Sequence, residues 1–255
     1  MKPFFSIITC TYNSQKFIKR NLESVNMQKY KNYEQIIIDG RSKDKTPIIV
    51  KKYMMKNPKI SFFSRTAKGI SNAFNIGLHK MKGKYVYFLN NDDFFYDNGV
   101  LADTASFLEK KDRDWIYGKI NVLESTGESL GIFPERKIFQ LASSRLLKYF
   151  NFIPHHAVFM KKSILDTYGG FREDLKVNMD YELYLRISKN TNWLFLDRII
   201  ANYLIRHDAA SSSIRNRIMN MKSFEEIQAL YLNSTERFIA KGANYFIDRY
   251  NKTYR

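Results

Sequence analysis

Residues 4–40 carry the pattern that indicates the fold class, and they read FFSIITCTYNSQKFIKRNLESVNMQKYKNYEQIIIDG. Residues 4–11 form an apolar, β-branched run of strand length, and Asn13-Ser14 then supplies a helix start. Apolar side chains recur on one helical face at Phe17, Ile18, Leu22 and Val25. A second apolar run at 35–38 stops at Asp39-Gly40. The stretch therefore predicts a strand, a helix and a second strand in succession.

The same alternation continues to residue 93. Thr46-Pro47 favours a helix from Pro47 to about Lys56. Strands at 60–63 and 85–89 then enclose a helix over 73–81. This alternation predicts a parallel α/β sheet, in which ligands bind outside the carboxyl ends of the strands. Polar clusters follow three of the predicted strands: Thr11-Tyr12-Asn13, Asp39-Gly40 and Asn90 to Asp93. One such cluster alone is typical of an ordinary turn, but three at the same edge of a sheet indicate a binding site.

The second half alternates less regularly. We expect strands at 115–118, 157–160 and 193–203, and a hairpin whose arms, 120–123 and 129–133, turn at Thr126-Gly127. We expect helices at 98–110, at 137–149, before Gly169-Gly170, from Asp180 onward and at 219–250. Because no repeat or linker interrupts the chain, we predict one continuous domain with a helical tail.

The composition excludes several classes of protein. The 255 residues are 44% hydrophobic and 15% aromatic, which is too apolar for an intrinsically disordered chain. Cys10 is the single cysteine, so a disulfide scaffold is excluded and a reducing, cytoplasmic compartment is expected. No stretch approaches the roughly 18–20 uninterrupted apolar residues of a membrane span.

The formal net charge of +17 is compatible with three kinds of partner: nucleic acid, an anionic membrane or a phosphate-bearing small molecule. Residues 41–70 contain nine Lys or Arg and a single acid, Asp44, which is a local net charge of +8. No helix-turn-helix, zinc or RRM-type signature supports a nucleic-acid-binding protein. No Gly-rich loop follows the first strand, which weakens the alternative of a nucleotidyltransferase. The basic residues instead fall beside the acidic strand ends, which suits a metal-bound diphosphate.

Five blocks of the sequence resemble family 2 glycosyltransferases, which have the GT-A fold and include inverting enzymes of bacterial surface-polysaccharide synthesis. The blocks are SIITCTYN at 6–13, IIIDGRSKDKT at 36–46, KGISNAFNIGL at 68–78, FLNNDD at 88–93 and MDYELYLR at 179–186. The resemblance is strong over 4–93, patchy to about 210 and absent beyond. It implies a GT-A domain over 1–213, a Rossmann-like mixed sheet with helices on both faces. Its nucleotide-binding half would be 1–95 and its acceptor half 96–213, with a C-terminal helical extension at 214–255.

The resemblance implies a metal-dependent, inverting glycosyltransferase. It would move a sugar from a nucleotide diphospho-sugar to a hydroxyl of a glycan or lipid-linked acceptor. A UDP-sugar is favoured as the donor, with GDP- and dTDP-sugars open. Also open are peripheral contact with an anionic membrane, on the cytoplasmic face of the inner membrane, and a homodimer. The C-terminal helix would serve either contact or pack on its own core.

Asp92-Asp93 resembles the acidic metal motif known as DXD. A divalent cation can neutralise the charge that develops on a departing nucleotide, and paired carboxylates are hard oxygen ligands that suit Mn²⁺ or Mg²⁺. The resemblance implies that Asp93 binds the metal and that Asp92 binds the metal or the ribose. His207 would join the metal or close over the diphosphate.

The donor site implied by the resemblance includes Asp39, whose carboxylate can accept a hydrogen bond from a base N–H. Tyr12 would pack against the base. The other donor-binding candidates are Thr9, Thr11, Asn13, Lys68, Gly69, Asn72, Asn91 and Asp92. The sequence departs from the family pattern where acids are expected, because it has Arg65, Ala67 and Asn72. The identity of the base is therefore open, and Arg65 and Lys68 are candidates for contacting phosphate.

Asp180 is the candidate general base. An inverting transfer needs a carboxylate that takes the proton from the acceptor hydroxyl as its oxygen attacks the anomeric carbon. An N-cap aspartate is the structural alternative at this position, and Glu182 is the competing catalytic candidate. His155 and His156 precede a predicted strand and are candidates for the acceptor side of the site.

Overall fold

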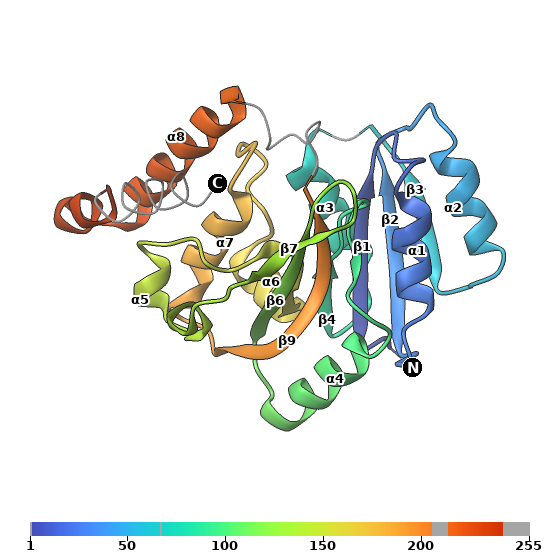
Figure 1. Cartoon of the computed structure of the whole chain (residues 1–255), viewed down its shortest axis with the longest axis horizontal. Helices are drawn as coiled ribbons and strands as arrows, with labels where there is room; N and C mark the ends of the chain where they lie inside the picture. Colours follow the sequence, from blue (N-terminus) through green and yellow to red (C-terminus); the bar gives the residue numbers. More distant parts are fainter. Residues whose placement is uncertain (1, 67, 206–213, 242–255) are drawn as a thin grey trace.

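A single mixed sheet runs through the protein, which is known from a computed structural model that describes residues 2–66, 68–205 and 214–241 (Figure 1). The strand order is β3-β2-β1-β4-β8-β6-β9-β5, with β7 paired to β6. The strands are β1 (Phe5–Thr11), β2 (Tyr33–Asp39), β3 (Ile60–Ser64), β4 (Tyr85–Phe88), β5 (Phe94–Phe95), β6 (Trp115–Leu123), β7 (Ser129–Phe133), β8 (Val158–Lys161) and β9 (Trp193–Leu204).

Helices cover both faces of the sheet. They are α1 (Ile18–Asn26), α2 (Thr46–Met54), α3 (Ile70–Lys80), α4 (Val100–Lys111), α5 (Ser144–Leu147), α6 (Lys162–Tyr168), α7 (Met179–Ser188) and α8 (Ile214–Tyr231), with 3-10 turns η1 (Lys137–Gln140) and η2 (His155–Ala157). Successive strand residues point to opposite faces. Ile7 and Ile37 thus pack on the side of α1, α2 and α4, whereas Ile8 packs on the side of α3, α6 and α7. None of the helices in the described residues is long and apolar enough to cross a membrane.

The expected parallel half of the sheet is confirmed. β1 pairs in parallel with β2 and with β4, and β2 pairs in parallel with β3. Thr11 lies opposite Asp39, which lies opposite Ser64. The carboxyl ends of these strands therefore meet at one edge.

The direction of the sheet reverses at β8. This strand is antiparallel to β4 on one side and to β6 on the other. Tyr87 near the end of β4 lies opposite Phe159 near the start of β8. The residues that precede β8 are thereby brought beside the residues that follow β4.

The segment 137–149 is not the single helix that we expected. It contains η1 and the one-turn α5, because the Ser143 hydroxyl accepts a hydrogen bond from the Leu146 N–H at 3.3 Å and starts a new helix. The expected strand 115–118 and hairpin arm 120–123 form one continuous strand, β6, and the turn at Thr126-Gly127 is confirmed.

The expected helix at 219–250 is also divided. α8 starts earlier, at Ile214, and ends at Tyr231, and a second helical segment covers 234–241. Asn233 and Glu236 form a reciprocal capping box between them: the Glu236 N–H donates to Asn233 Oδ1 at 2.9 Å, and the Asn233 N–H donates to Glu236 Oε2 at 3.1 Å. Residues 242–250 lie outside the described residues.

A glycine lets α3 approach β1 closely. A Cβ on Gly77 would lie 2.5 Å from Cγ2 of the buried Ile8. We expect Gly77→Ala to lower the free energy of unfolding by about 1–3 kcal/mol through overpacking. This loss should appear in urea unfolding even though alanine is the better helix former by about 1 kcal/mol.

Ile8→Ala provides the control for this prediction. In the double variant the methyl group added at position 77 fills the space left by the Ile8 side chain. The loss of unfolding free energy in the double variant should therefore be smaller than the sum of the losses in the two single variants. Strict additivity in this double-mutant cycle would contradict the proposed contact.

Candidate functional site

Asp39 is held at the end of β2 by four hydrogen bonds. Oδ1 accepts from the hydroxyls of Thr11 at 2.9 Å and Ser42 at 2.5 Å, and Oδ2 accepts from the Ser42 N–H at 3.0 Å and the Ser64 hydroxyl at 3.1 Å. Asp39 is fully buried. A carboxylate has about four lone-pair sites. Contact between Asp39 and a nucleobase would therefore require one of these hydroxyls to turn away.

The loops after β1 and β2 are joined beside Asp39. Asn13 adopts a left-handed φ of 49°. It is therefore not helical, and α1 begins at Ile18 instead of at the expected start near Asn13-Ser14. Its N–H donates to the Ser42 hydroxyl at 2.8 Å, and its Oδ1 accepts from the Lys43 N–H at 2.9 Å. Tyr12 is 63% exposed beside this junction. The paired loops thus form a firm support from which an aromatic ring projects.

The Asp92-Asp93 turn follows β4 at the same edge. The Asp93 N–H donates to the Asn90 carbonyl at 3.2 Å, and the Asn91 side chain donates to the Cys10 carbonyl at 3.2 Å. Asp93 is only 1% exposed, whereas Asp92 is half-buried. The Asp93 carboxylate lies 3.4 Å from His156 Nε2 and also accepts from the Leu204 N–H at 3.4 Å. This carboxylate therefore joins η2 and β9 to the end of β4.

His155 and His156 lie beside this turn, as the reversal at β8 requires. Burial lowers the pKa of each imidazole to about 4, so both are neutral near pH 7. His156 stacks on Tyr203 with ring centroids 4.4 Å apart.

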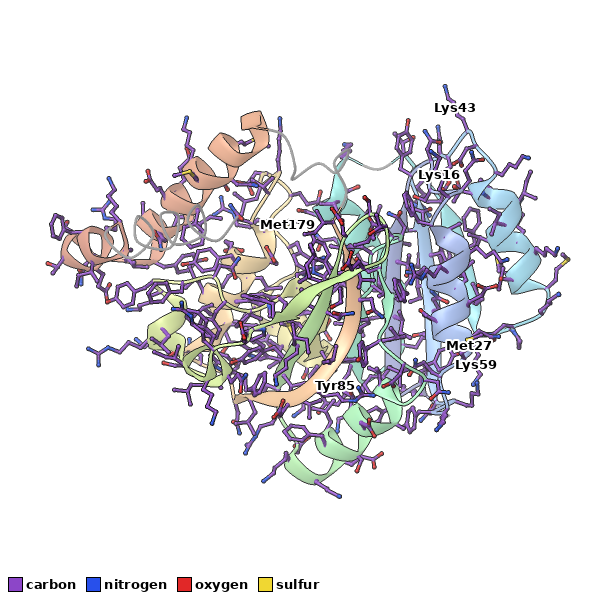
Figure 2. The ribbon with its side chains drawn as sticks, viewed as in Figure 1. Lys16, Met27, Lys43, Lys59, Tyr85 and Met179 are labelled. Atoms are coloured by element: carbon purple, nitrogen blue, oxygen red, sulfur yellow. The ribbon has the colours of Figure 1, made fainter. Side chains whose placement is uncertain are left out.

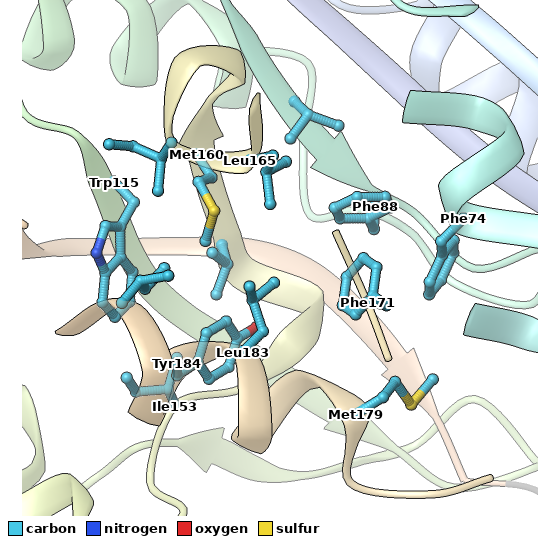
Figure 3. Close-up of a cluster of buried hydrophobic side chains, with 14 of the residues drawn as sticks. Phe74, Phe88, Trp115, Ile153, Met160, Leu165, Phe171, Met179, Leu183 and Tyr184 are labelled. Carbon is cyan, nitrogen blue, oxygen red and sulfur yellow. The ribbon is translucent and has the colours of Figure 1, made fainter. Parts of the chain in front are cut away.

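His155 lies among aromatic rings. Its ring contacts Phe74, Phe88 and Phe171, which lie together in the buried cluster of Figure 3. Its Nε2 atom is buried and has no hydrogen-bond partner among the described residues. The structure therefore holds a neutral imidazole with an unused polar atom.

Asp180 lies in the first turn of α7. The helix begins after Asn178, whose side chain does not cap it, so Asp180 is not an N-cap residue. The negative charge of Asp180 acts to raise the pKa of His155, opposing the larger effect of burial, so the two side chains are electrostatic neighbours. Asp180 is half-buried, and its carboxylate accepts no hydrogen bond from the described residues.

Figure 2 shows Met179, the first residue of α7, toward the same end of the molecule as Lys16 and Lys43. Lys59 and Tyr85, which precede or begin parallel strands, lie toward the opposite end. α7 therefore starts at the end of the molecule where the parallel strands finish.

Glu182 has a different environment from Asp180. It is 1% exposed, and its two oxygens accept from Arg186 at 3.1 and 2.9 Å. The Tyr231 hydroxyl also donates to it at 2.5 Å. Arg186 in turn donates to the carbonyls of residues 168–170. Glu182 thus connects α7 to α8 through Tyr231, and to the end of α6 through Arg186.

The candidates at the start of α3 adjoin the loop that leads to α7. Gly69 has a φ of 103°, and the Lys68 N–H donates to Asn72 Oδ1 at 3.2 Å. The Asn72 amide donates to Glu173 at 2.9 Å, and the Asn75 amide donates to the same carboxylate at 3.0 Å. An aspartate at position 72 would repel Glu173, so the departure from the family pattern is matched by a local partner. The Lys68 side chain is exposed.

Thr9 does not reach the surface of the site. It is fully buried, and its hydroxyl accepts from the Gln35 amide at 3.5 Å beneath the strand ends. The sequence reasoning missed Gln35 and its partner Asn21, as well as Ser42, Ser64 and Glu173. Asn21 had a detectable signal, because it is a polar residue on the face that Phe17, Ile18, Leu22 and Val25 make apolar.

The donor set for a metal is small. Within residues 2–66, 68–205 and 214–241, no three or more His, Cys, Asp or Glu side chains are grouped so that they could hold a metal ion. Mg²⁺ is commonly bound by one or two carboxylates together with substrate phosphates and water. Asp92 and Asp93 are two neighbouring carboxylates of the kind that such a site uses. His207 lies outside the described residues.

Solved glycosyltransferase structures share this fold. TarS (residues 1–349) from S. aureus, in complex with UDP-GlcNAc, has a TM-score of 0.73 and 22% sequence identity over 93% of this chain and 69% of that chain. The mannosyltransferase PcManGT from Pyrobaculum calidifontis, in complex with GDP-Man and Mn²⁺, has a TM-score of 0.69 and 16% identity over 92% of this chain and 66% of that chain. The expected GT-A fold is therefore confirmed.

Curated relatives are similar along most of the chain. An uncharacterized glycosyltransferase of Rickettsia typhi is 28% identical over 254 residues, 95% of this chain and 77% of the relative. A PGL/p-HBAD biosynthesis glycosyltransferase of Mycobacterium bovis is 28% identical over 205 residues, 79% of this chain and 77% of the relative. The sequence model described as "Glycosyl transferase family 2" matches residues 6–169, from β1 to the end of α6. Because that match covers more than half of the sequence, the chain belongs to glycosyl transferase family 2 and is a glycosyltransferase.

Proposed function

We propose that this glycosyltransferase is metal-dependent and inverting, and that it moves a sugar from a nucleotide diphospho-sugar to a hydroxyl of a glycan or lipid-linked acceptor in surface polysaccharide synthesis. The observation that carries the proposal is the meeting of three groups at one end of the molecule. These groups are the Asp92-Asp93 turn, the neutral His155 and the carboxylate of Asp180, which accepts no hydrogen bond from the part of the chain that the structure describes. Family membership favours this function over nucleic-acid binding or nucleotidyl transfer.

The parallel half would bind the donor. Structural neighbours were solved with UDP-GlcNAc and with GDP-Man, and this supports a nucleotide-sugar donor here. We favour a UDP-sugar. The exposed ring of Tyr12 is available to stack on a base, and Asn91 and Asp92 border the same edge.

Asp93 and Asp92 would hold the divalent cation, as Mn²⁺ or Mg²⁺. When bound, the cation supplies positive charge that offsets the charge developing on the diphosphate as the sugar leaves. Hydrogen bonding by Leu204 and proximity to His156 restrict the position of the Asp93 carboxylate. The exposed Arg65 and Lys68 bring further positive charge toward the diphosphate.

Asp180 would act as the general base. It would take the proton from the acceptor hydroxyl as that oxygen attacks the anomeric carbon from the face opposite the nucleotide. The neutral His155 would help to form the acceptor side, because the charge of Asp180 acts on its pKa and its buried Nε2 atom has no hydrogen-bond partner among the described residues. Glu182 is less suited to this role, because Arg186 and Tyr231 occupy its oxygens.

We also propose that the protein contacts an anionic membrane peripherally, because its formal net charge is +17.

Asp93→Asn should abolish metal-dependent nucleotide binding. The variant keeps the size of the side chain but loses its charge, and transfer should fall by at least about 100-fold. Thermal unfolding with UDP, GDP and dTDP, each with and without Mn²⁺, should show a shift for the wild type that the variant lacks. Asp97→Asn is the matched control, since Asp97 pairs with Arg198 outside the turn. An Asp93→Asn protein with the full Mn²⁺-dependent shift would refute the metal assignment.

Asp180→Asn should keep donor binding and lose transfer by about 10²–10⁴-fold, because the amide cannot accept the proton. The donor-induced thermal shift and kcat are the two measurements. Glu182→Gln should show the opposite pattern, with a lower melting temperature and a preserved kcat. Wild-type turnover by Asp180→Asn, or loss of turnover by a folded Glu182→Gln, would make Asp180 the wrong choice.

A further inference from the structure

Polar side chains line the side of α1 that faces residues 90–101, and Gln28, two residues beyond the helix, continues this row. Asn21 and Gln28 are fully buried, and Ser24 lies between them. The Ser24 hydroxyl accepts from the Phe95 N–H at 3.2 Å. Gln28 donates to the Asp97 carbonyl at 2.6 Å and accepts from the Leu101 N–H at 3.0 Å. This row therefore holds the whole stretch that runs from the acidic turn into α4.

Asn21 binds both ends of the acidic turn itself. Its amide nitrogen donates to the Asn90 carbonyl at 2.7 Å and to the Asp93 carbonyl at 3.1 Å. The Asn90 carbonyl also closes the turn by accepting the Asp93 N–H. One buried side chain thus fixes the distance between the first and last residues of the turn that carries Asp92 and Asp93.

Neighbouring groups fix the orientation of this amide. Two carbonyls face its nitrogen, and the reversed orientation would place its oxygen against both of them. Its oxygen accepts from the Gln35 amide at 3.1 Å. Gln35 gives both of its N–H groups to Asn21 and Thr9, while its own buried oxygen has no partner among the described residues. An unpaired buried oxygen lowers stability. Gln35 therefore carries an energetic cost, while its amide nitrogen holds Asn21 in the orientation that binds the turn.

We infer that Asn21 is a positioning residue for the Asp92-Asp93 turn and sets the affinity of its carboxylates for a divalent cation in the presence of a nucleoside diphosphate. Asparagine is a weak helix former in mid-helix and is unfavourable when buried without partners. Its three hydrogen bonds, two of them to the acidic turn, account for its presence at this position in α1. The inference rests on the proposed function, because it requires that the turn binds a cation.

The experiment compares Asn21→Leu with Gln28→Leu in the full chain. The two side chains are equally buried and each makes three hydrogen bonds, but only Asn21 contacts the acidic turn. Mn²⁺ affinity is measured by electron paramagnetic resonance of the free ion, with UDP in one series and GDP in another. We expect Asn21→Leu to weaken Mn²⁺ binding by about 10- to 100-fold and Gln28→Leu to change it by less than about 2-fold. Both should lower the melting temperature by about 3–10 °C.

Asn21→Ser keeps the test decisive if the leucine variant does not fold. A serine hydroxyl can donate to one carbonyl but not to both, so its Mn²⁺ affinity should lie between those of the wild type and Asn21→Leu. Unchanged affinity in the Asn21 variants, or equal weakening in Gln28→Leu, would overturn the inference and leave the proposed function intact. A wild type that binds no Mn²⁺ with either nucleotide would instead refute the metal assignment, and the positioning role with it.

Discussion

The antiparallel pairing of β8 with β4 is the constraint on which the site depends. A sheet that remained parallel beyond β4 would place the start of the next strand at the opposite edge from the Asp92-Asp93 turn. The reversal places His155 and His156 beside that turn instead, and the register of Tyr87 with Phe159 fixes how far they extend. The Asp92-Asp93 turn and the two histidines therefore meet because β8 is antiparallel to β4.

Three carboxylates at this end of the molecule differ in how much freedom their surroundings leave them. Asp39 receives four hydrogen bonds and is locked. Asp93 is buried but lies at the junction of three segments. Asp180 is half-buried and receives no hydrogen bond from the described residues. A metal ligand benefits from restraint and a proton acceptor needs an available lone pair, so this gradient matches the roles that we propose.

Local pattern was sufficient to predict the parallel half. Each of its strands is a short apolar run that ends in polar residues, so the positions of Asp39 and of the Asp92-Asp93 turn followed from sequence. The burial of Thr9 did not follow, because helices cover both faces of β1 and the partner of its hydroxyl, Gln35, comes from the neighbouring strand. The division between α8 and the segment at 234–241 had a local signal in Asn233 and Glu236, but apolar spacing across it resembled one helix.

The pair Asp180 and Glu182 shows where sequence reasoning stops. Two positions apart on a helix, their side chains point in nearly opposite directions, so only one of them can face a given cleft. Which one does so depends on Arg186 and Tyr231, and Tyr231 comes from α8, far along the chain. The structure separates the two because the second half folds around Glu182, whereas the charge of Asp180 acts on the pKa of His155.

Asp93 links the two halves that the sequence divides near residue 95. Its main-chain carbonyl is bound by Asn21 of α1, and its carboxylate is bound by Leu204 at the end of β9. β5, the two residues that follow it, pairs with β9 as well. A change in the position of β9 or of the histidines would therefore act directly on the proposed metal ligand.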